Sequence, residues 1–138
     1  MKIVLISCSK NKKLGHHKAR DLYSSTLFKF NLKYAQSIGD KVFILSAKYG
    51  LLDLDKEVDY YNETLNDKQA NEIKIWTVKV ITSLENIIKS EDEIILLAGT
   101  KYRKYLMPYF INKGIKIEAP FKHLGIGRQL HKLKELIK

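Results

Sequence analysis

Four short apolar runs, separated by longer amphipathic stretches, dominate the hydrophobic pattern of this sequence. The runs are Lys2–Ser7, Lys41–Ser46, Glu93–Ala98 and Ile115–Glu118. Three of them consist almost entirely of Val, Ile, Leu and Phe, without alternating polar positions. Strands have this composition when both faces of their sheet are covered, as in the parallel sheets of α/β proteins. The runs therefore predict buried, mostly parallel strands.

The amphipathic stretches predict four helices. These run from Ser25 to about Ile38, from near Asn66 to about Ile88, from about Thr100 to Asn112, and from about Gly127 to the end of the sequence. Apolar residues recur three or four positions apart in the first two, which is the spacing of one helix face. Gly39 follows the first as a C-cap glycine would, and Asn66 and Gln69 have the spacing of a capping box.

Strands and helices alternate along the chain, and this order predicts the fold class. Alternation is typical of an α/β domain with a mostly parallel central sheet, here of about four strands, and helices on both faces. The length of 138 residues fits a single domain over residues 1–138. The connection Ala47–Leu65 is long and mostly without periodicity. Long ordered loops in compact domains are usually functional.

The charge of the chain is strongly positive and unevenly distributed. Twenty-five Lys and Arg residues against fifteen Asp and Glu give a net charge of +10. Residues 1–38 hold eight basic residues and one acid, whereas residues 101–138 hold ten and two. If the two ends of the chain lie side by side, they form one basic face that attracts polyanions, chiefly nucleic acid. The alternative is that the lysines serve only as solvated surface residues.

Cysteine content and hydropathy indicate the compartment. Cys8 is the only cysteine, so no intrachain disulfide can form, which suits a reducing environment. No segment reaches the roughly 18 apolar residues of a membrane helix. The first apolar run is too short for a signal peptide and is followed at once by the charged run Lys10–Lys13. We expect a cytoplasmic protein without membrane association.

Polar residues follow the predicted strands, where α/β proteins bind their ligands. Those we take as candidate binding residues are Cys8, Ser9 and Lys10, then Ser46, Lys48, Tyr49 and Gly50, then Gly99, Thr100 and Tyr102. Small residues let a ligand approach the backbone, helix N-termini and lysines attract phosphate, and tyrosines can stack on a base. The pattern predicts a pocket for a phosphorylated or nucleobase-bearing ligand.

Several other chemistries find no support in the sequence. Neither the P-loop pattern nor G-x-G-x-x-G occurs, and no His or Cys spacing suits a zinc site. We therefore expect no metal and no cofactor. Cys8 is either a thiol activated by nearby lysines or a small lining residue. Asp21 is either an ion-pair partner of Arg20 or a lysine, or a site residue, and Asp55 is either solvated or a general base.

Longer motifs carry a resemblance to a known family. They are Ser46–Leu52 (SAKYGLL) with Asp55 and residues 61–65, residues 8–10 with 19–23 and 27–28, and residues 125–130. Together they resemble an uncharacterised domain of many phage and bacterial genomes, related to the YaaA-like superfamily. The resemblance implies a compact α/β domain connected with DNA or modified bases, and an architecture likened to uracil-DNA glycosylases. It adds Arg20, Tyr61, Thr64 and Arg128 to the candidate binding residues.

These observations give a leading hypothesis and two alternatives. The hypothesis is a nucleic-acid-associated domain, with DNA the favoured partner, that takes a nucleobase or nucleotide into the strand-end pocket as an N-glycosidase or base-processing enzyme. The alternatives are a non-catalytic DNA-binding protein of stress response or phage biology, and an enzyme of free nucleosides or nucleotides.

Each group of candidate residues has an expected role in the leading hypothesis. Tyr49 or Tyr61 would stack on the base. Asp55 or Asp21 would orient water or stabilise the oxocarbenium charge. The phosphate ligands would be Lys10, Lys48 and Arg128, and the base-edge ligands Ser9, Ser46 and Thr100.

Overall fold

A five-stranded sheet forms the centre of the computed structural model, which describes residues 1–137. The strand order is β4-β3-β1-β6-β7. The strands are β1 (Lys2–Ser7), β3 (Lys41–Ser46), β4 (Gly50–Asp53), β6 (Glu93–Leu97) and β7 (Lys116–Glu118). β1 pairs in parallel with β3 and β6, β6 pairs in parallel with β7, and only β4 runs antiparallel, against β3. The predicted α/β class with a mostly parallel sheet is confirmed.

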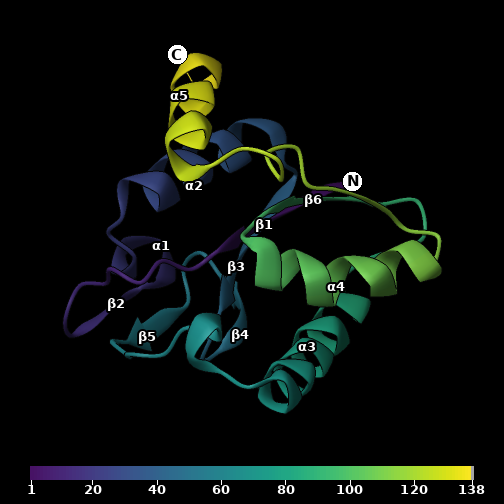
Figure 1. The fold of residues 1–138 in the computed structure, drawn as a ribbon, viewed down its shortest axis with the longest axis horizontal. Helices are drawn as coiled ribbons and strands as arrows, with labels where there is room; N and C mark the ends of the chain where they lie inside the picture. The colour runs from purple at the N-terminus through teal and green to yellow at the C-terminus, as the bar shows by residue number, and fades with distance from the viewer. Residues whose placement is uncertain (138) are drawn as a thin grey trace.

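Helices cover both faces of this sheet. The two on one face are α2 (Thr26–Ile38) and α5 (Ile126–Leu136), and the two on the other are α3 (Ala70–Glu85) and α4 (Thr100–Asn112) (Figure 1). The helices of each pair contact one another. The central strand β1 is buried between the layers, with residues 3–6 fully inaccessible to solvent. Continuous apolar composition of a strand therefore reflects its burial on both faces, as expected.

The long connection between β3 and α3 contains structure that the sequence pattern does not reveal. It forms β4 and then β5 (Glu57–Asp59), which pairs antiparallel with β2 (His16–Lys18) in a small second sheet. A single helical turn, α1 (Ala19–Leu22), follows β2. β2 and β5 are three residues long and mostly polar, so hydrophobic periodicity could not predict them. The small sheet lies beyond the carboxyl end of β1, at the left of Figure 1.

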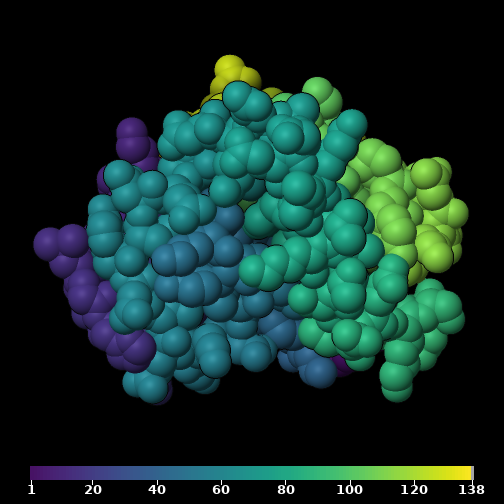
Figure 2. Space-filling model, turned by 90° about the horizontal axis from the view of Figure 1, so that it is seen from below, coloured from purple at the N-terminus to yellow at the C-terminus, as the bar shows by residue number. Residues whose placement is uncertain are grey.

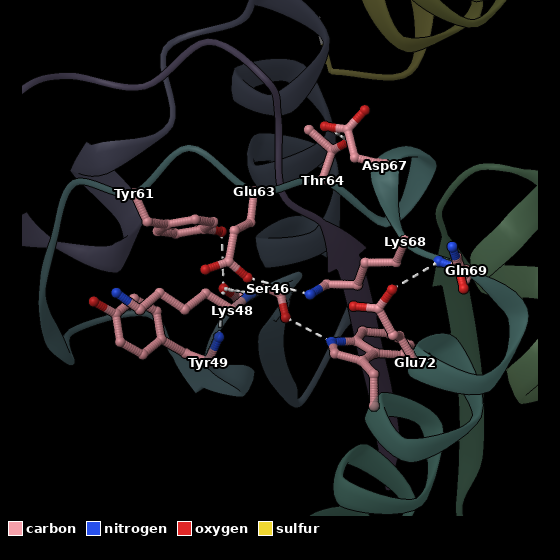
Figure 3. Close-up of polar contacts among 11 residues, drawn as sticks. Ser46, Lys48, Tyr49, Tyr61, Glu63, Thr64, Asp67, Lys68, Gln69 and Glu72 are labelled. Carbon is pink, nitrogen blue, oxygen red and sulfur yellow. Dashed lines mark hydrogen bonds and ion pairs between the residues drawn. The ribbon is translucent and has the colours of Figure 1, made fainter.

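Of the two helix starts predicted from capping residues, one agrees with the structure and the other does not. Ser25 is the N-cap of α2, where its Oγ accepts a hydrogen bond from Phe28 N at 3.1 Å. The predicted helix start near Asn66 is wrong, because residues 65–67 form the short 3₁₀ helix η1 (Leu65–Asp67) and α3 begins at Ala70. Its capping box pairs Gln69 with Glu72 (Figure 3). The capping box therefore lies three residues later in the sequence than the predicted pair, Asn66 and Gln69.

No helix among residues 1–137 combines the length and the apolar composition needed to cross a bilayer.

Candidate functional site

The chain leaves β1 and β6, which are neighbours in the sheet, toward opposite faces. The connection after β1 leads to α2 on one face, and that after β6 leads directly to α4 on the other. Ligands of open α/β sheets bind at such a topological switch point, beyond the carboxyl ends of the strands. A cavity of about 220 Å³ lies here, lined by Cys8, Ser9, Lys10, Thr64, Leu65, Asn66, Asp67 and Tyr102. We call it the switch-point crevice.

Three segments far apart in sequence are held together around the crevice. The residue after β1 stays tied to the sheet, because Cys8 N donates to Leu45 O at 2.9 Å. Cys8 Sγ lies 3.4 Å from the hydroxyl of Tyr102, in the first turn of α4. Lys101 Nζ, in the same turn, donates to the carbonyl oxygens of Leu65 (3.4 Å) and Asn66 (3.2 Å) in η1. These bonds fix β1, η1 and α4 relative to one another.

The crevice has one lysine and one carboxylate in its lining, and the N-terminus of α4 beside it. Gly99 is the N-cap of α4 and offers no side-chain cap, and the first turn of α4 contains no acid. The free N–H groups and the helix dipole therefore favour an anion at this point. Lys10 also lines the crevice and is exposed. Asp67 is the single carboxylate among the lining residues, and it accepts a hydrogen bond from Thr64 Oγ1 at 3.1 Å.

A chain of buried hydroxyl groups lies behind the crevice. Ser46 Oγ donates to Tyr61 Oη at 2.8 Å, and Tyr61 Oη lies 2.7 Å from Tyr23 Oη. Ser46 Oγ also accepts from Tyr49 N at 3.0 Å (Figure 3). The carbonyl oxygen of Ser46 accepts from Trp76 Nε1 at 2.8 Å. The polar atoms of this chain satisfy one another, which makes it a structural element of the core.

The tyrosines around Cys8 are held in their neutral form. Burial raises the pKa of Tyr23, Tyr61 and Tyr102 above the usual value, and a negative charge on Cys8 would raise each further. Burial likewise lowers the pKa of Lys12, whose Nζ lies 4.5 Å from the centre of the Tyr61 ring. The tyrosine hydroxyls therefore remain hydrogen-bond donors at neutral pH.

Five of the residues expected from the sequence meet in the crevice: Cys8, Ser9, Lys10, Thr64 and Tyr102. Sequence reasoning missed the three η1 residues that line it, Leu65, Asn66 and Asp67. Two signals pointed near them, namely the long connection that ends at Leu65 and the polar pair Asn66 and Asp67. The helical interpretation of Asn66 as a cap concealed their place in a loop.

The two carboxylates expected to act in catalysis lie elsewhere. Asp55 forms an ion pair with Arg20, with Asp55 Oδ1 2.9 Å from Arg20 Nε. Asp21 is exposed, and neither acid lines the crevice. Arg20 is thus paired with an acid of the loop before β5 rather than with its neighbour Asp21, which was one of the two pairings we considered.

Other expected residues lie outside the crevice for identifiable reasons. Tyr61 and Ser46 are buried in the hydroxyl chain, so Tyr61 has no free face for a base. Gly50 has φ +76° at the turn into β4, a conformation that favours glycine. Tyr49 borders a shallow hollow of about 480 Å³ beside β4 and β5. That hollow has three carboxylates, Asp53, Glu57 and Asp59, which oppose a polyanion.

Lys48 belongs to a separate groove beside α3. The molecule is hollowed here between α3 and the segment that precedes it (Figure 2). The groove measures about 320 Å³ and includes Lys48, Glu63, Lys68 and Glu72. Lys68 Nζ is 3.2 Å from Glu63 Oε2, and Figure 3 shows these side chains facing one another. With Lys79, the groove has three lysines against two glutamates, and the Lys68–Glu63 ion pair neutralises one lysine of the three.

The remaining expected residues lie near helix N-termini. Gly99 and Thr100 begin α4 beside the crevice and are exposed, and Thr100 Oγ1 accepts from Arg103 Nη2 at 3.2 Å. Arg128 is exposed in the first turn of α5, on the other face of the sheet. It is therefore not a lining residue of the crevice.

The two ends of the chain do lie side by side, because α2 packs against α5 (Figure 1). Their exposed basic residues are Lys29, Lys33, Arg128, Lys132 and Lys134. The one acid in these two helices, Glu135, lies 2.9 Å from His131 Nε2. We call this surface the α2–α5 basic face.

No group of three or more His, Cys, Asp or Glu side chains among the described residues is arranged to hold a metal ion.

Comparisons with known proteins give the chain a family. A family model described as "Family of unknown function (DUF6884)" matches residues 3–135. No curated protein and no solved structure gave a match. Since the family model spans nearly all of the sequence, the chain belongs to the DUF6884 family, whose function is unknown.

Proposed function

We propose that this protein binds a nucleobase-bearing ligand, presented by nucleic acid, in the switch-point crevice and hydrolyses its N-glycosidic bond. The observation that supports the proposal is the composition of the crevice. One lysine, a helix N-terminus, hydroxyls and a single carboxylate surround one cavity at the switch point of the sheet. The net charge of +10 and the resemblance to the DNA-linked YaaA-like proteins agree with a nucleic-acid partner.

The crevice residues suit distinct parts of such a ligand. Lys10 and the uncapped N–H groups of α4 would bind a phosphate. The hydroxyl and amide groups of Ser9, Thr64 and Asn66 would bind the sugar and base. A volume of about 220 Å³ admits one nucleoside but no duplex. The target nucleotide would therefore be single-stranded or flipped out of the helix.

Asp67 is the residue for the chemical step, in place of the acids expected from the sequence. Its carboxylate would orient a water molecule whose oxygen attacks the anomeric carbon C1′. As the C1′–N bond breaks, its electron pair leaves with the base nitrogen, which takes up a proton from solvent. Asp67 accepts the proton of the attacking water and stabilises the positive charge that develops on the sugar.

Oligonucleotide binding and base release test the two parts of this proposal. Binding of fluorescent single-stranded oligonucleotides should weaken steeply as salt rises. Release of base from oligonucleotides with normal and modified bases should be lost in Asp67→Asn, with binding retained. Asp55→Asn, which changes an acid outside the crevice, should release base as the wild type does. Absence of binding at low salt, or base release that survives Asp67→Asn, would contradict the proposal.

Action on a free nucleoside or nucleotide is the second candidate, and the small volume of the crevice favours it. Tight binding of mononucleotides together with no affinity for oligonucleotides would establish this candidate. The charge of the α2–α5 basic face would then be a property of the surface alone.

A further inference from the structure

An asparagine occupies an apolar position of α2. The residues of α2 that are buried against the sheet are Phe28, Asn31 and Ala35. Their spacing of three and four positions is that of the apolar face of a helix, where a hydrocarbon side chain is the usual choice. Asn31 is only 6% exposed. Its carboxamide therefore lies inside the protein, on the layer next to β1.

The carboxamide oxygen of Asn31 has no protein partner. No donor of the described residues lies within hydrogen-bonding distance of Asn31 Oδ1, which is fully inaccessible. Most buried polar atoms are hydrogen-bonded, because an unpaired one loses its hydration without compensation. The buried hydroxyls of Ser46 and Tyr61 obey this rule. Asn31 Oδ1 and Arg20 Nε depart from it, and only Arg20 Nε has an ion-pair partner, Asp55.

Asn31 lines a small cavity that adjoins the switch-point crevice. The cavity measures about 90 Å³ and is lined by Ser7, Cys8, Ser9, Ser25, Leu27, Phe28 and Asn31. We call it the α2 cavity. It shares Cys8 and Ser9 with the crevice, so the two spaces meet at the residues that follow β1. A ligand in the crevice that extends past Cys8 and Ser9 would reach Asn31.

The hydrogen-bonding groups of the α2 cavity define the chemistry of that group. Asn31 offers an acceptor oxygen beside a donor NH₂. Ser25 Oγ accepts from Phe28 N, which leaves its own proton free to donate. Ser9 Oγ already donates to Asn11 O at 2.7 Å. A complementary group has a donor next to an acceptor, as the edge of a nucleobase has. A phosphate, which has no donor when ionised, does not satisfy Asn31 Oδ1.

We infer that the α2 cavity is the base-recognition subsite, in which Asn31 reads the hydrogen-bonding edge of a nucleobase whose sugar and phosphate lie in the switch-point crevice. The inference rests on the proposed function and adds to it a specificity-determining residue. It also gives the unpaired amide a partner: because Asn31 Oδ1 is inaccessible in the empty protein, the carboxamide would turn toward the cavity to pair with the ligand.

Nucleotide binding by an Asn31→Leu variant tests this inference. Leucine has the branching of asparagine at Cγ, with two methyl groups in place of the polar atoms, and is the larger side chain. The probes are the four ribonucleoside 5′-monophosphates and ribose 5-phosphate, which has the same sugar and phosphate without a base. In Asn31→Leu, affinity for the preferred nucleotide should fall by about tenfold or more. Affinity for ribose 5-phosphate should not change. Gln36→Leu, which alters an exposed amide of the same helix, is the matched control and should bind as wild type.

Each outcome bears on the inference. If Asn31→Leu discriminates among the four nucleotides as the wild type does, the inference is wrong and the proposed function stands. If the wild type binds neither nucleotides nor oligonucleotides, both are wrong.

The melting temperature adds a second criterion, because removing an unpaired polar atom should leave the melting temperature equal or higher. A lower melting temperature with unchanged discrimination would mean that Asn31 has a structural role, satisfied by an internal water. Asn31→Ala provides the same comparison if the leucine variant does not fold.

Discussion

At the residue scale, the polar groups near the carboxyl end of β1 fall into two kinds. Ser46, Tyr61 and Tyr23 satisfy one another and fix the core behind the crevice. Asp67 faces the crevice, and Asn31 has no protein partner. The first kind stabilises the fold and the second is available to a ligand. Substitutions in the two kinds should therefore have opposite consequences for stability and binding.

Tyr61→Phe should destabilise the protein by about 1–3 kcal/mol, because it removes the hydroxyl between two buried partners. Chemical denaturation gives the free energy of unfolding. The neighbouring Tyr60 is partly exposed, and Tyr60→Phe is the matched control, with an expected change near zero. Equal free energies for the two variants would show that the hydroxyl chain does not stabilise the core.

Alkaline pH should destabilise the protein through its buried tyrosines. Burial raises the pKa of Tyr23, Tyr61 and Tyr102 in the folded state, whereas the unfolded value is about 10. The folded state thus keeps protons that the unfolded state releases, so the contribution to stability is complete below about pH 10 and is lost as the pH rises further. In a pH titration, part of the tyrosinate absorbance should appear only when the protein unfolds. Circular dichroism monitors the unfolding at each pH. Ionisation of all eight tyrosines before the fold is lost would contradict this.

At the scale of secondary-structure elements, close packing decides where substitutions are tolerated. Gly39 ends α2 next to β1, and a Cβ atom there would lie 2.7 Å from Val4 Cγ2 and 3.0 Å from Ala35 O. Its φ of −97° is open to any residue, so the requirement is for space. Gly127 in α5 has no atom within 4 Å of such a Cβ. The two glycines differ in surroundings although both adjoin helices.

Gly39→Ala should therefore destabilise the protein by about 1–3 kcal/mol, through overpacking against a backbone carbonyl. Gly127→Ala should raise the stability by about 0.5 kcal/mol, because alanine is the better helix former. Thermal unfolding of both variants measures the difference. A melting temperature of Gly39→Ala at or above that of the wild type would show that α2 can move away from β1.

The sequence predicted the elements whose hydrophobic period is strong. Continuous apolar composition identified β1, β3 and β6, and Ser25 and Gly39 marked the ends of α2. β5 and η1 were not predicted, because each has three residues and depends on contacts with distant segments. For the same reason, the crevice residues that follow β1 and β6 were found, whereas Asp67 was not. Asn31 was a visible signal, as a polar residue within an apolar stripe, but its burial is evident only in the structure.

At the scale of the whole molecule, the packing of α2 on α5 joins the two basic ends of the chain. We expect the α2–α5 basic face to bind the phosphates of nucleic acid that flank the nucleotide in the crevice. Phosphate contacts contribute salt-dependent affinity without sequence preference.

Lys33→Glu and Lys132→Glu should each weaken oligonucleotide binding and make its salt dependence less steep by about one unit of the log–log slope per lost contact. Lys74→Glu changes an exposed lysine of α3 on the other face and is the control, with little expected effect beyond that of net charge. Equal losses in all three variants would indicate that only the net charge of the protein matters.

The central claim is that the switch-point crevice is the ligand site, and amide chemical-shift mapping by NMR tests it most directly. Isotope-labelled protein would be titrated with a short single-stranded oligonucleotide and with mononucleotides. We expect the largest shifts at residues 8–10, at residues 64–67 and around Tyr102. Shifts confined to the groove beside α3 or to the hollow beside β4 and β5, with none in the crevice, would contradict the claim and place the ligand elsewhere.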